Sequence, residues 1–63
     1  MKFTIKELRR AKGISQEEMA EHCGVHINTY RAWEEKPSEI KLSMAKMIAD
    51  KLGIRIEDVD FLP

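Results

Sequence analysis

Between Glu21 and Glu34 the chain carries no Asp or Glu, although 35% of its residues are charged. The charged or titratable side chains left in this acid-free window are Arg31 and two histidines. Asn and Arg pair bidentately with adenine and guanine in the DNA major groove, whereas a carboxylate there meets phosphate charge. The window therefore favours contact with double-stranded DNA.

The spacing in this window predicts a helix from about His26 to Glu35. Tyr30 and Trp33 fall on one face of it, with Val25 leading in, and we expect that face to be buried. Both aromatic side chains are therefore predicted to stabilise the core rather than to stack on bases.

The opposite face of the same helix points outward and carries residue types suited to base recognition. Asn28 matches the N6 and N7 groups of adenine, and Arg31 matches the O6 and N7 groups of guanine. Small apolar side chains can pack on a thymine methyl group. For Ile27, packing against Tyr30 is an equal alternative. The predicted base-reading residues are Ile27, Asn28, Arg31 and Ala32.

The segment before the window predicts a second helix and a tight turn. Ser15 and Glu18 have the spacing of a capping box, and Ile14 and Met19 that of a hydrophobic staple. Gly24 is suited to the left-handed conformation that ends a helix. Two helices around such a turn form a helix-turn-helix, in which the second helix lies in the major groove and the first crosses the phosphate backbone.

Basic charge is concentrated at the N-terminal end. Residues 1–12 hold five basic side chains and one acidic, for a charge of +4, whereas residues 13–35 hold one basic and five acidic, for −4. A net charge of zero over the whole chain argues against indiscriminate coating of nucleic acid. Gln16 is placed to bond a phosphate together with helix-terminal amides. Charge at the flank of the site is predicted to come from Arg9, Arg10 and Lys12.

The remaining pattern predicts an all-α domain of about five helices, spanning residues 1–63. A helix from about Thr4 to Lys12 precedes the pair, and one from about Leu42 to Lys51 follows it, with Gly53 as its stop. A chain of 63 residues buries only about 60% of its unfolded surface, so the core must be small. The inward residues expected in the later helix are Met44, Met47, Ile48 and Leu52.

An apolar cluster closes the chain around one short helical turn, with Ile54 and Ile56 at its start. It either completes the core or forms a two-fold interface, and we expect a mixture because so small a core would leave part of it exposed. The candidates for a dimer interface are Val59, Phe61 and Leu62.

Other chemistries find little support in the sequence. His22, Cys23 and His26 are metal-ligand types, but Gly24 breaks the helix between them and Cys23 falls on the inward side, so no metal or cofactor is expected. No Ser-His-Asp arrangement, buried acid–base pair or phosphate-binding glycine loop suggests an enzyme or a small-molecule substrate. A single cysteine, with no signal peptide or membrane-spanning segment, indicates the reducing cytoplasm and no membrane partner.

Several short runs form one combined pattern: Leu8-Arg9, the run from Gly13 to Ala20, Cys23-Gly24-Val25, Trp33-Glu34, and the run from Ile48 to Ile54. Together these runs resemble the Xre/Cro-type helix-turn-helix family of phage and bacterial repressors. The resemblance covers residues 5–52, most of the chain.

The resemblance implies a lambda-repressor-like fold and roles for individual residues. Gln16 matches the glutamine that contacts the DNA backbone, and Glu34 matches an acid that forms a structural salt bridge, here with Arg9 or Arg10. The variable base-reading positions of the family are matched by His26, Ile27, Asn28, Arg31 and Ala32. His26 is nevertheless assigned to the backbone contacts, with Gln16, Arg9, Arg10 and Lys12.

The chain departs from the family pattern at two places. His26 stands where a capping Ser or Thr is common, so either it caps the helix weakly or Asn28 caps a shorter one. Glu35-Lys36-Pro37 replaces the usual glycine after the helix, which predicts a different loop.

The function expected from these observations is a sequence-specific transcriptional regulator, of the phage- or mobile-element repressor type. As a homodimer it would bind a palindromic operator with half-sites about one helical turn apart. Two alternatives remain: the antitoxin of a toxin–antitoxin pair, and a protein-interaction module that kept the fold without binding DNA.

Overall fold

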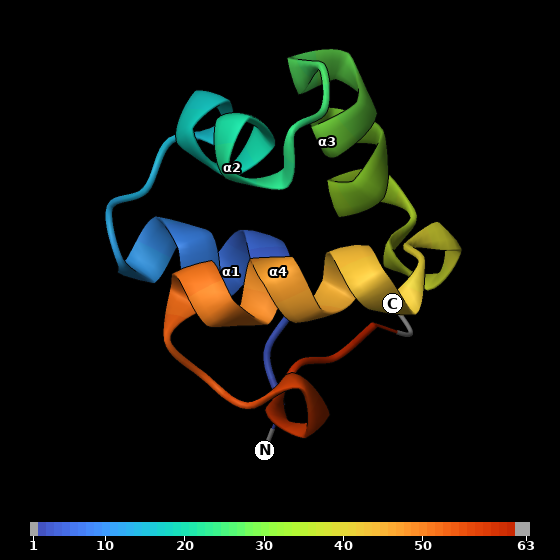
Figure 1. Cartoon of the computed structure of the whole chain (residues 1–63). Helices are drawn as coiled ribbons and strands as arrows, with labels where there is room; N and C mark the ends of the chain where they lie inside the picture. The colour runs from blue at the N-terminus through green and yellow to red at the C-terminus, as the bar shows by residue number, and fades with distance from the viewer. Residues whose placement is uncertain (1, 62–63) are drawn as a thin grey trace.

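The computed structural model describes residues 2–61, and all of their regular structure is helical apart from one isolated bridge (Figure 1). This confirms the all-α prediction. In place of about five helices, these residues form four α-helices and two single 3₁₀ turns. The α-helices are α1 (Ile5–Ala11), α2 (Gln16–Cys23), α3 (Ile27–Glu35) and α4 (Leu42–Leu52), and the turns are η1 (Pro37–Glu39) and η2 (Ile56–Asp58).

Side-chain caps compensate for the shortness of α1 and α2, which have 7 and 8 residues. The predicted capping box of α2 is present: Ser15 Oγ accepts from the amide of Glu18 at 3.0 Å, and the Glu18 carboxylate accepts from the amide of Ser15 at 3.0 Å. A second capping box, between Thr4 and Glu7, begins α1. Helices this short are marginal alone, so the caps and the packing together hold them. No helix among residues 2–61 is long and apolar enough to cross a membrane.

Gly24 ends α2 in the left-handed conformation, with φ of +69°. Its amide donates to the carbonyl of Glu21, and the amide of Val25 donates to the carbonyl of Ala20, at 3.1 and 3.0 Å. These two bonds are the pair that defines a Schellman motif. They reverse the chain within a few residues and set the direction in which α3 leaves α2.

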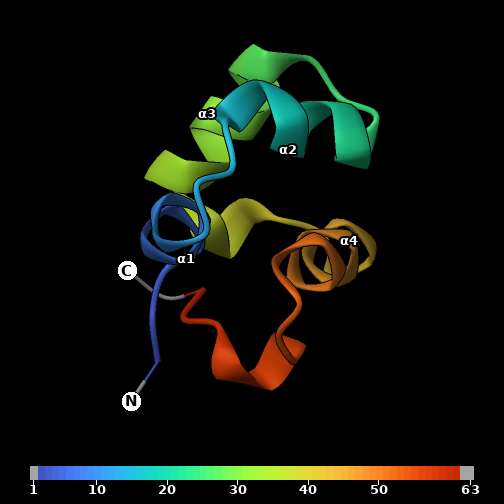
Figure 2. The same cartoon turned by 90° about the vertical axis from the view of Figure 1, so that its left-hand side faces the viewer.

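The helices form two layers around one core. In both views α2 and α3 lie on one side of α1 and α4, and η2 lies on the other side (Figures 1 and 2). The contacts of α2 with α3 and with α4 dominate the packing. The residues buried at the centre are Ile5, Met19, Ala20, Cys23, Tyr30, Ile48, Leu52 and Val59.

The buried face of α4 differs from the predicted one. Ile48 and Leu52 are buried as expected, but Met44 and Met47 are only half-buried. Ala45 and Ala49 point inward in their place. The buried stripe runs along positions 45, 48, 49 and 52, which follow helical spacing.

The C-terminal cluster is divided between the core and the surface. Val59 is only 3% exposed and forms a parallel bridge with Phe3, and the amide of Asp60 donates to the carbonyl of Phe3 at 2.9 Å. The assignment of Val59 to a dimer interface is therefore wrong, because the monomer already buries it. Phe61 is half-buried against the core. Leu62 lies outside the described residues.

Replacing Gly24 with Ala is expected to lower the free energy of unfolding by about 1–2 kcal/mol, as measured by urea unfolding. A Cβ at this position would meet no atom within 4 Å, so the cost is that of the left-handed backbone alone. The control is Gly24→Asn, since Asn tolerates this conformation better and should cost less. Equal losses for the two variants would contradict the explanation.

Candidate nucleic-acid interface

Helix α3 has the two faces predicted from the sequence, one turned to the core and one exposed. Tyr30 is fully buried and Trp33 half-buried, with their rings in an edge-to-face contact at 6.2 Å. Asn28, Arg31 and Ala32 are exposed on the other side. The structure thus brings three of the four predicted base-reading residues together on one open helix face.

Ile27, the fourth predicted base-reading residue, is only partly exposed. It is half-buried and packs against the core, and it also lines a shallow hollow with Val25 and with Ala20 of α2. Of the two alternatives considered from the sequence, core packing accounts for most of this side chain. Only its exposed part remains for a contact outside the molecule.

His26 is the N-cap of α3, which decides between the two starts left open by the sequence. Its Nδ1 accepts a hydrogen bond from the amide of Asn28 at 3.0 Å. An Nδ1 that accepts leaves the proton of the neutral ring on Nε2, so the exposed edge of His26 is a hydrogen-bond donor. Because His26 performs the capping, Asn28 sits in the first turn with an exposed side chain.

A buried ion pair lies beneath this surface and joins α1 to α3. The Nε of Arg9 donates to Glu34 at 2.6 Å, and its Nη2 donates to the same carboxylate at 3.3 Å. The Nη1 of Arg9 donates to the carbonyl of Ile14 at 2.9 Å. The side chains of the pair are only 10% and 3% exposed. Arg9, rather than Arg10, is therefore the salt-bridge partner of Glu34.

This pairing corrects the assignment of Arg9 to the DNA backbone. All three nitrogens of its guanidinium donate to groups within the protein, and the residue is 8% exposed, so it has no free face to offer a phosphate. Arg10 and Lys12 are exposed and keep that assignment as a prediction. His26, also exposed, remains a candidate for a backbone contact.

The ion pair shifts the pKa values of the groups around it. Burial acts to raise the pKa of Glu34, but hydrogen bonding from Arg9, with smaller contributions from Tyr30 and Gln16, outweighs it and lowers the pKa below its ordinary value. The hydrogen bond to Glu34 raises the pKa of Arg9 above its ordinary value, which is already high. The Tyr30 hydroxyl is buried beside the carboxylate, with a geometry too poor for a defined hydrogen bond, and burial first and Glu34 second raise its pKa. All three groups therefore keep a single protonation state near neutral pH.

Gln16 connects the ion pair to the exposed face of α3. Its Nε2 donates to Glu34 at 3.0 Å, while its Oε1 accepts from the Nε of Arg31 at 3.2 Å. This link between the first turn of α2 and the middle of α3 was missed in the sequence analysis. No local pattern signals it, because the two residues that it joins are 15 positions apart.

The histidines and the cysteine do not form a metal site. Cys23 is buried in the core, and burial raises the pKa of its thiol, which disfavours the thiolate that binds metals. Within residues 2–61, no group of three His, Cys, Asp or Glu side chains is placed to hold a metal ion.

Comparison with known families agrees with this geometry. A family model described as Helix-turn-helix, of the Xre-like type, matches residues 5–59, nearly the whole chain. The chain belongs to this helix-turn-helix family. No curated protein and no solved structure gives a significant match to it.

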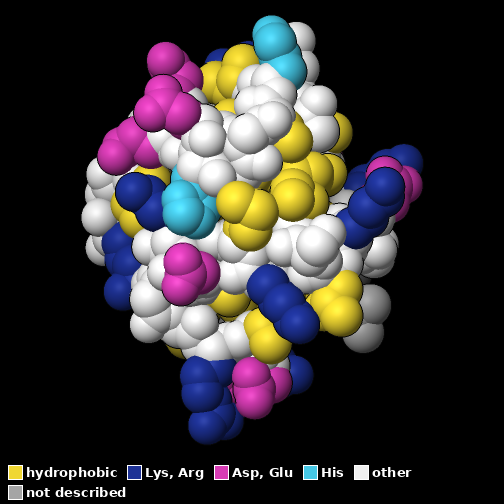
Figure 3. Space-filling model, viewed as in Figure 1, with side chains coloured by type: hydrophobic (Ala, Val, Ile, Leu, Met, Phe, Trp, Pro, Cys, Tyr) yellow, Lys and Arg dark blue, Asp and Glu magenta, His cyan; other side chains and the backbone are white. Residues whose placement is uncertain are grey.

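Membership of this family indicates what the candidate site binds and which helices form it. This helix-turn-helix protein is a DNA-binding regulator, and its partner is double-stranded DNA. The motif consists of α2, the turn at Gly24 and α3. Acidic side chains gather over α2 (Figure 3), whereas α3 carries no acid before Glu34. A surface free of carboxylates is what insertion between two phosphate backbones requires.

Removing the basic partner of the buried pair is expected to destabilise the helix-turn-helix domain. Arg9→Leu leaves Glu34 buried without its main donor, which should lower the free energy of unfolding by about 3 kcal/mol or more. Arg10→Leu, at the exposed neighbouring position, is the control and should change it by less than about 0.5 kcal/mol. Chemical denaturation of both variants measures the difference. Similar losses would contradict a structural role confined to Arg9.

Acid is expected to destabilise the domain through Glu34. Because its folded-state pKa is lowered, its stabilising contribution is complete above the ordinary value of 4.5 and is lost as the pH falls through the folded pKa. The slope of unfolding free energy against pH below 4.5 should be smaller in Glu34→Gln than in the wild type. It should not vanish, because Glu18 also has a lowered pKa, caused by the backbone and side chain of Ser15. An unchanged slope would contradict the assignment to Glu34.

Proposed function

We propose that residues 1–63 act as one sequence-specific DNA-binding domain of a transcriptional repressor, of the phage- or mobile-element type, in the reducing cytoplasm. The observation that carries the proposal is the open face of α3, where Asn28, Arg31 and Ala32 are exposed together on a stretch of helix that has no carboxylate before Glu34. The family resemblance supports the repressor type.

In this proposal α3 lies in the major groove and each exposed side chain has a preferred base. Asn28 bonds N6 and N7 of an adenine, and Arg31 bonds O6 and N7 of a guanine. Ala32 and the exposed part of Ile27 pack on thymine methyl groups. Each bidentate pair contributes roughly 1–3 kcal/mol of discrimination against the wrong base.

Contacts with the phosphate backbone hold the helix in register in this proposal. Arg10 and Lys12 supply charge from the end of α1, and the Nε2–H of His26 supplies a hydrogen-bond donor beside the first turn of α3. Gln16 contributes its second amide hydrogen at the N-terminus of α2, where the backbone amides also favour a phosphate. These contacts position the protein without selecting a sequence.

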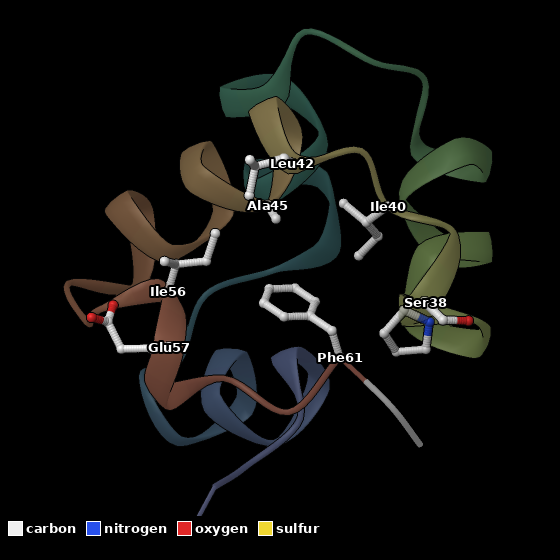
Figure 4. A pocket seen from close by; sticks show the side chains of 8 residues that line it. Ser38, Ile40, Leu42, Ala45, Ile56, Glu57 and Phe61 are labelled. Atoms are coloured by element: carbon white, nitrogen blue, oxygen red, sulfur yellow. The ribbon is translucent and has the colours of Figure 1, made fainter.

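A homodimer would double this site, and an apolar groove supports one. The groove has a volume of about 400 Å³, and Phe61 points into it between Ile40 and Ile56 (Figure 4). Leu42 stands at its edge with 64% of its surface exposed and so extends the apolar lining to the surface. A second copy seated there would bring two α3 helices to half-sites about one turn apart on a palindromic operator.

The same groove supports the second candidate function, the antitoxin of a toxin–antitoxin pair, in which a toxin rather than a second copy covers it. The zero net charge supports the third, a protein-interaction module that does not bind DNA. Salt separates the third from the others, because phosphate contacts make affinity fall steeply with salt concentration.

Selection from a pool of random duplexes at two salt concentrations tests the DNA-binding proposal. The wild type is expected to enrich a palindromic site and to bind it more tightly at low salt, and the double variant Asn28→Ala, Arg31→Ala to lose the enrichment. Lys46→Ala removes one exposed positive charge from α4 and should keep it. No enrichment by the wild type at low salt would overturn the proposal.

The dimer is tested by Leu42→Glu. Glu is compatible with the first turn of α4, where a negative charge is favoured, so the variant should fold. Sedimentation equilibrium is expected to show it as a monomer at concentrations where the wild type associates, with enrichment reduced to half-sites. Ser43→Glu places the same charge at the next exposed position, outside the groove, and should associate as the wild type does. Association of Leu42→Glu would exclude the groove as the interface.

A further inference from the structure

Arg31 is exposed, yet its guanidinium is held in place from one side. Its Nε donates to Gln16 Oε1 at 3.2 Å, so the two terminal nitrogens, Nη1 and Nη2, remain for another partner. These are the nitrogens that form a fork to O6 and N7 of guanine. The hydrogen bond therefore restrains the side chain without using the groups that would read a base.

Gln16 is itself oriented by the buried pair. Its amide nitrogen donates to Glu34 Oε1, which fixes which end of the amide is the donor and leaves Oε1 facing Arg31. Glu34 in turn is fixed by two hydrogen bonds from Arg9. A continuous chain of hydrogen bonds thus runs from the core to the centre of the exposed face of α3.

We propose that Gln16 is a positioning residue for Arg31 and so sets how strongly the protein distinguishes guanine from other bases. This inference rests on the proposed function, in which Arg31 reads a guanine, and adds the residue that governs that contact. Only one amide hydrogen of Gln16 remains for a phosphate, because its oxygen and its other hydrogen are already bonded within the protein.

The physical basis is the conformational entropy of a long side chain. Immobilising an unrestrained arginine at an interface costs roughly 0.5–1.5 kcal/mol of conformational entropy, equivalent to about 2- to 13-fold in affinity. In the free protein Gln16 has already restricted Arg31, so less is lost on binding the correct base. A wrong base does not bond the two terminal nitrogens of Arg31, so the restraint does not strengthen its binding. The restraint therefore increases discrimination between bases rather than affinity for DNA in general.

A double-mutant cycle tests the inference with the duplex enriched from the random pool. The variants are Gln16→Met, which keeps the length of the side chain but removes both hydrogen bonds, Arg31→Ala, and the two combined. Each is measured on the enriched duplex and on duplexes with single base-pair replacements. Arg31→Ala identifies the guanine, because discrimination there should be lost.

At that base pair Gln16→Met is expected to lower the ratio of affinities for the right and wrong base by up to about 2- to 13-fold. In the Arg31→Ala background the same substitution should leave the ratio unchanged. If Gln16→Met instead weakens both duplexes equally, and still does so without Arg31, Gln16 is a phosphate contact and the inference is overturned. If Arg31→Ala changes no ratio, or no duplex is enriched, it is the proposed function that fails.

A measurement on the free protein tests the restraint without DNA. The Nε–H of Arg31 can be followed by NMR, and its exchange with solvent should be several-fold faster in Gln16→Met than in the wild type, while urea unfolding of both variants shows that each is folded. Equal exchange rates in the two proteins would show that Gln16 does not hold Arg31 and would overturn the inference.

Discussion

The structure depends on a buried charge that must be neutralised. Glu34 lies at the end of α3 with only 3% of its side chain exposed, and an isolated carboxylate in such a place would be strongly destabilising. Arg9 satisfies it from α1 and also bonds the carbonyl of Ile14 in the loop before α2. The pair therefore fixes the positions of α1, the α1–α2 loop and α3 relative to one another, with a directionality that apolar contacts lack.

Much of the helix-turn-helix was predictable because its signals are local. The capping box at Ser15, the stop at Gly24 and the two faces of α3 each depend on residues within one or two turns of each other, and all three are present in the structure. The choice of Arg9 over Arg10 was also accessible, since Arg9 lies four residues after the buried Ile5 and so shares its helix face.

Features that join distant parts of the chain were not predictable in this way. Val59 is buried because the N-terminal segment at Phe3 pairs with it, and no spacing within the C-terminal cluster indicates that partner. The inward face of α4 was misplaced in part because hydrophobicity alone favours methionine over alanine, whereas the helix turns Ala45 and Ala49 inward along the same stripe as Ile48 and Leu52. The link from Gln16 to Arg31 requires the angle between α2 and α3, which the turn sets only in three dimensions.

Because the net charge of the chain is zero, the orientation of the polar side chains on α3 matters more for the proposed DNA binding than it would in a strongly basic domain. A strongly basic domain is attracted to any duplex, and its affinity arises largely from release of counterions. This chain has no net positive charge, so the proposed function relies more on a few groups that are oriented before DNA arrives. His26 accepting from Asn28 and Gln16 accepting from Arg31 both provide such orientation, one at the start of α3 and one at its centre. Of these two hydrogen bonds, the one between Gln16 and Arg31 is anchored to the buried pair that joins α1 to α3, because Gln16 also donates to Glu34. In the proposed function, stability and recognition therefore share part of one hydrogen-bond network.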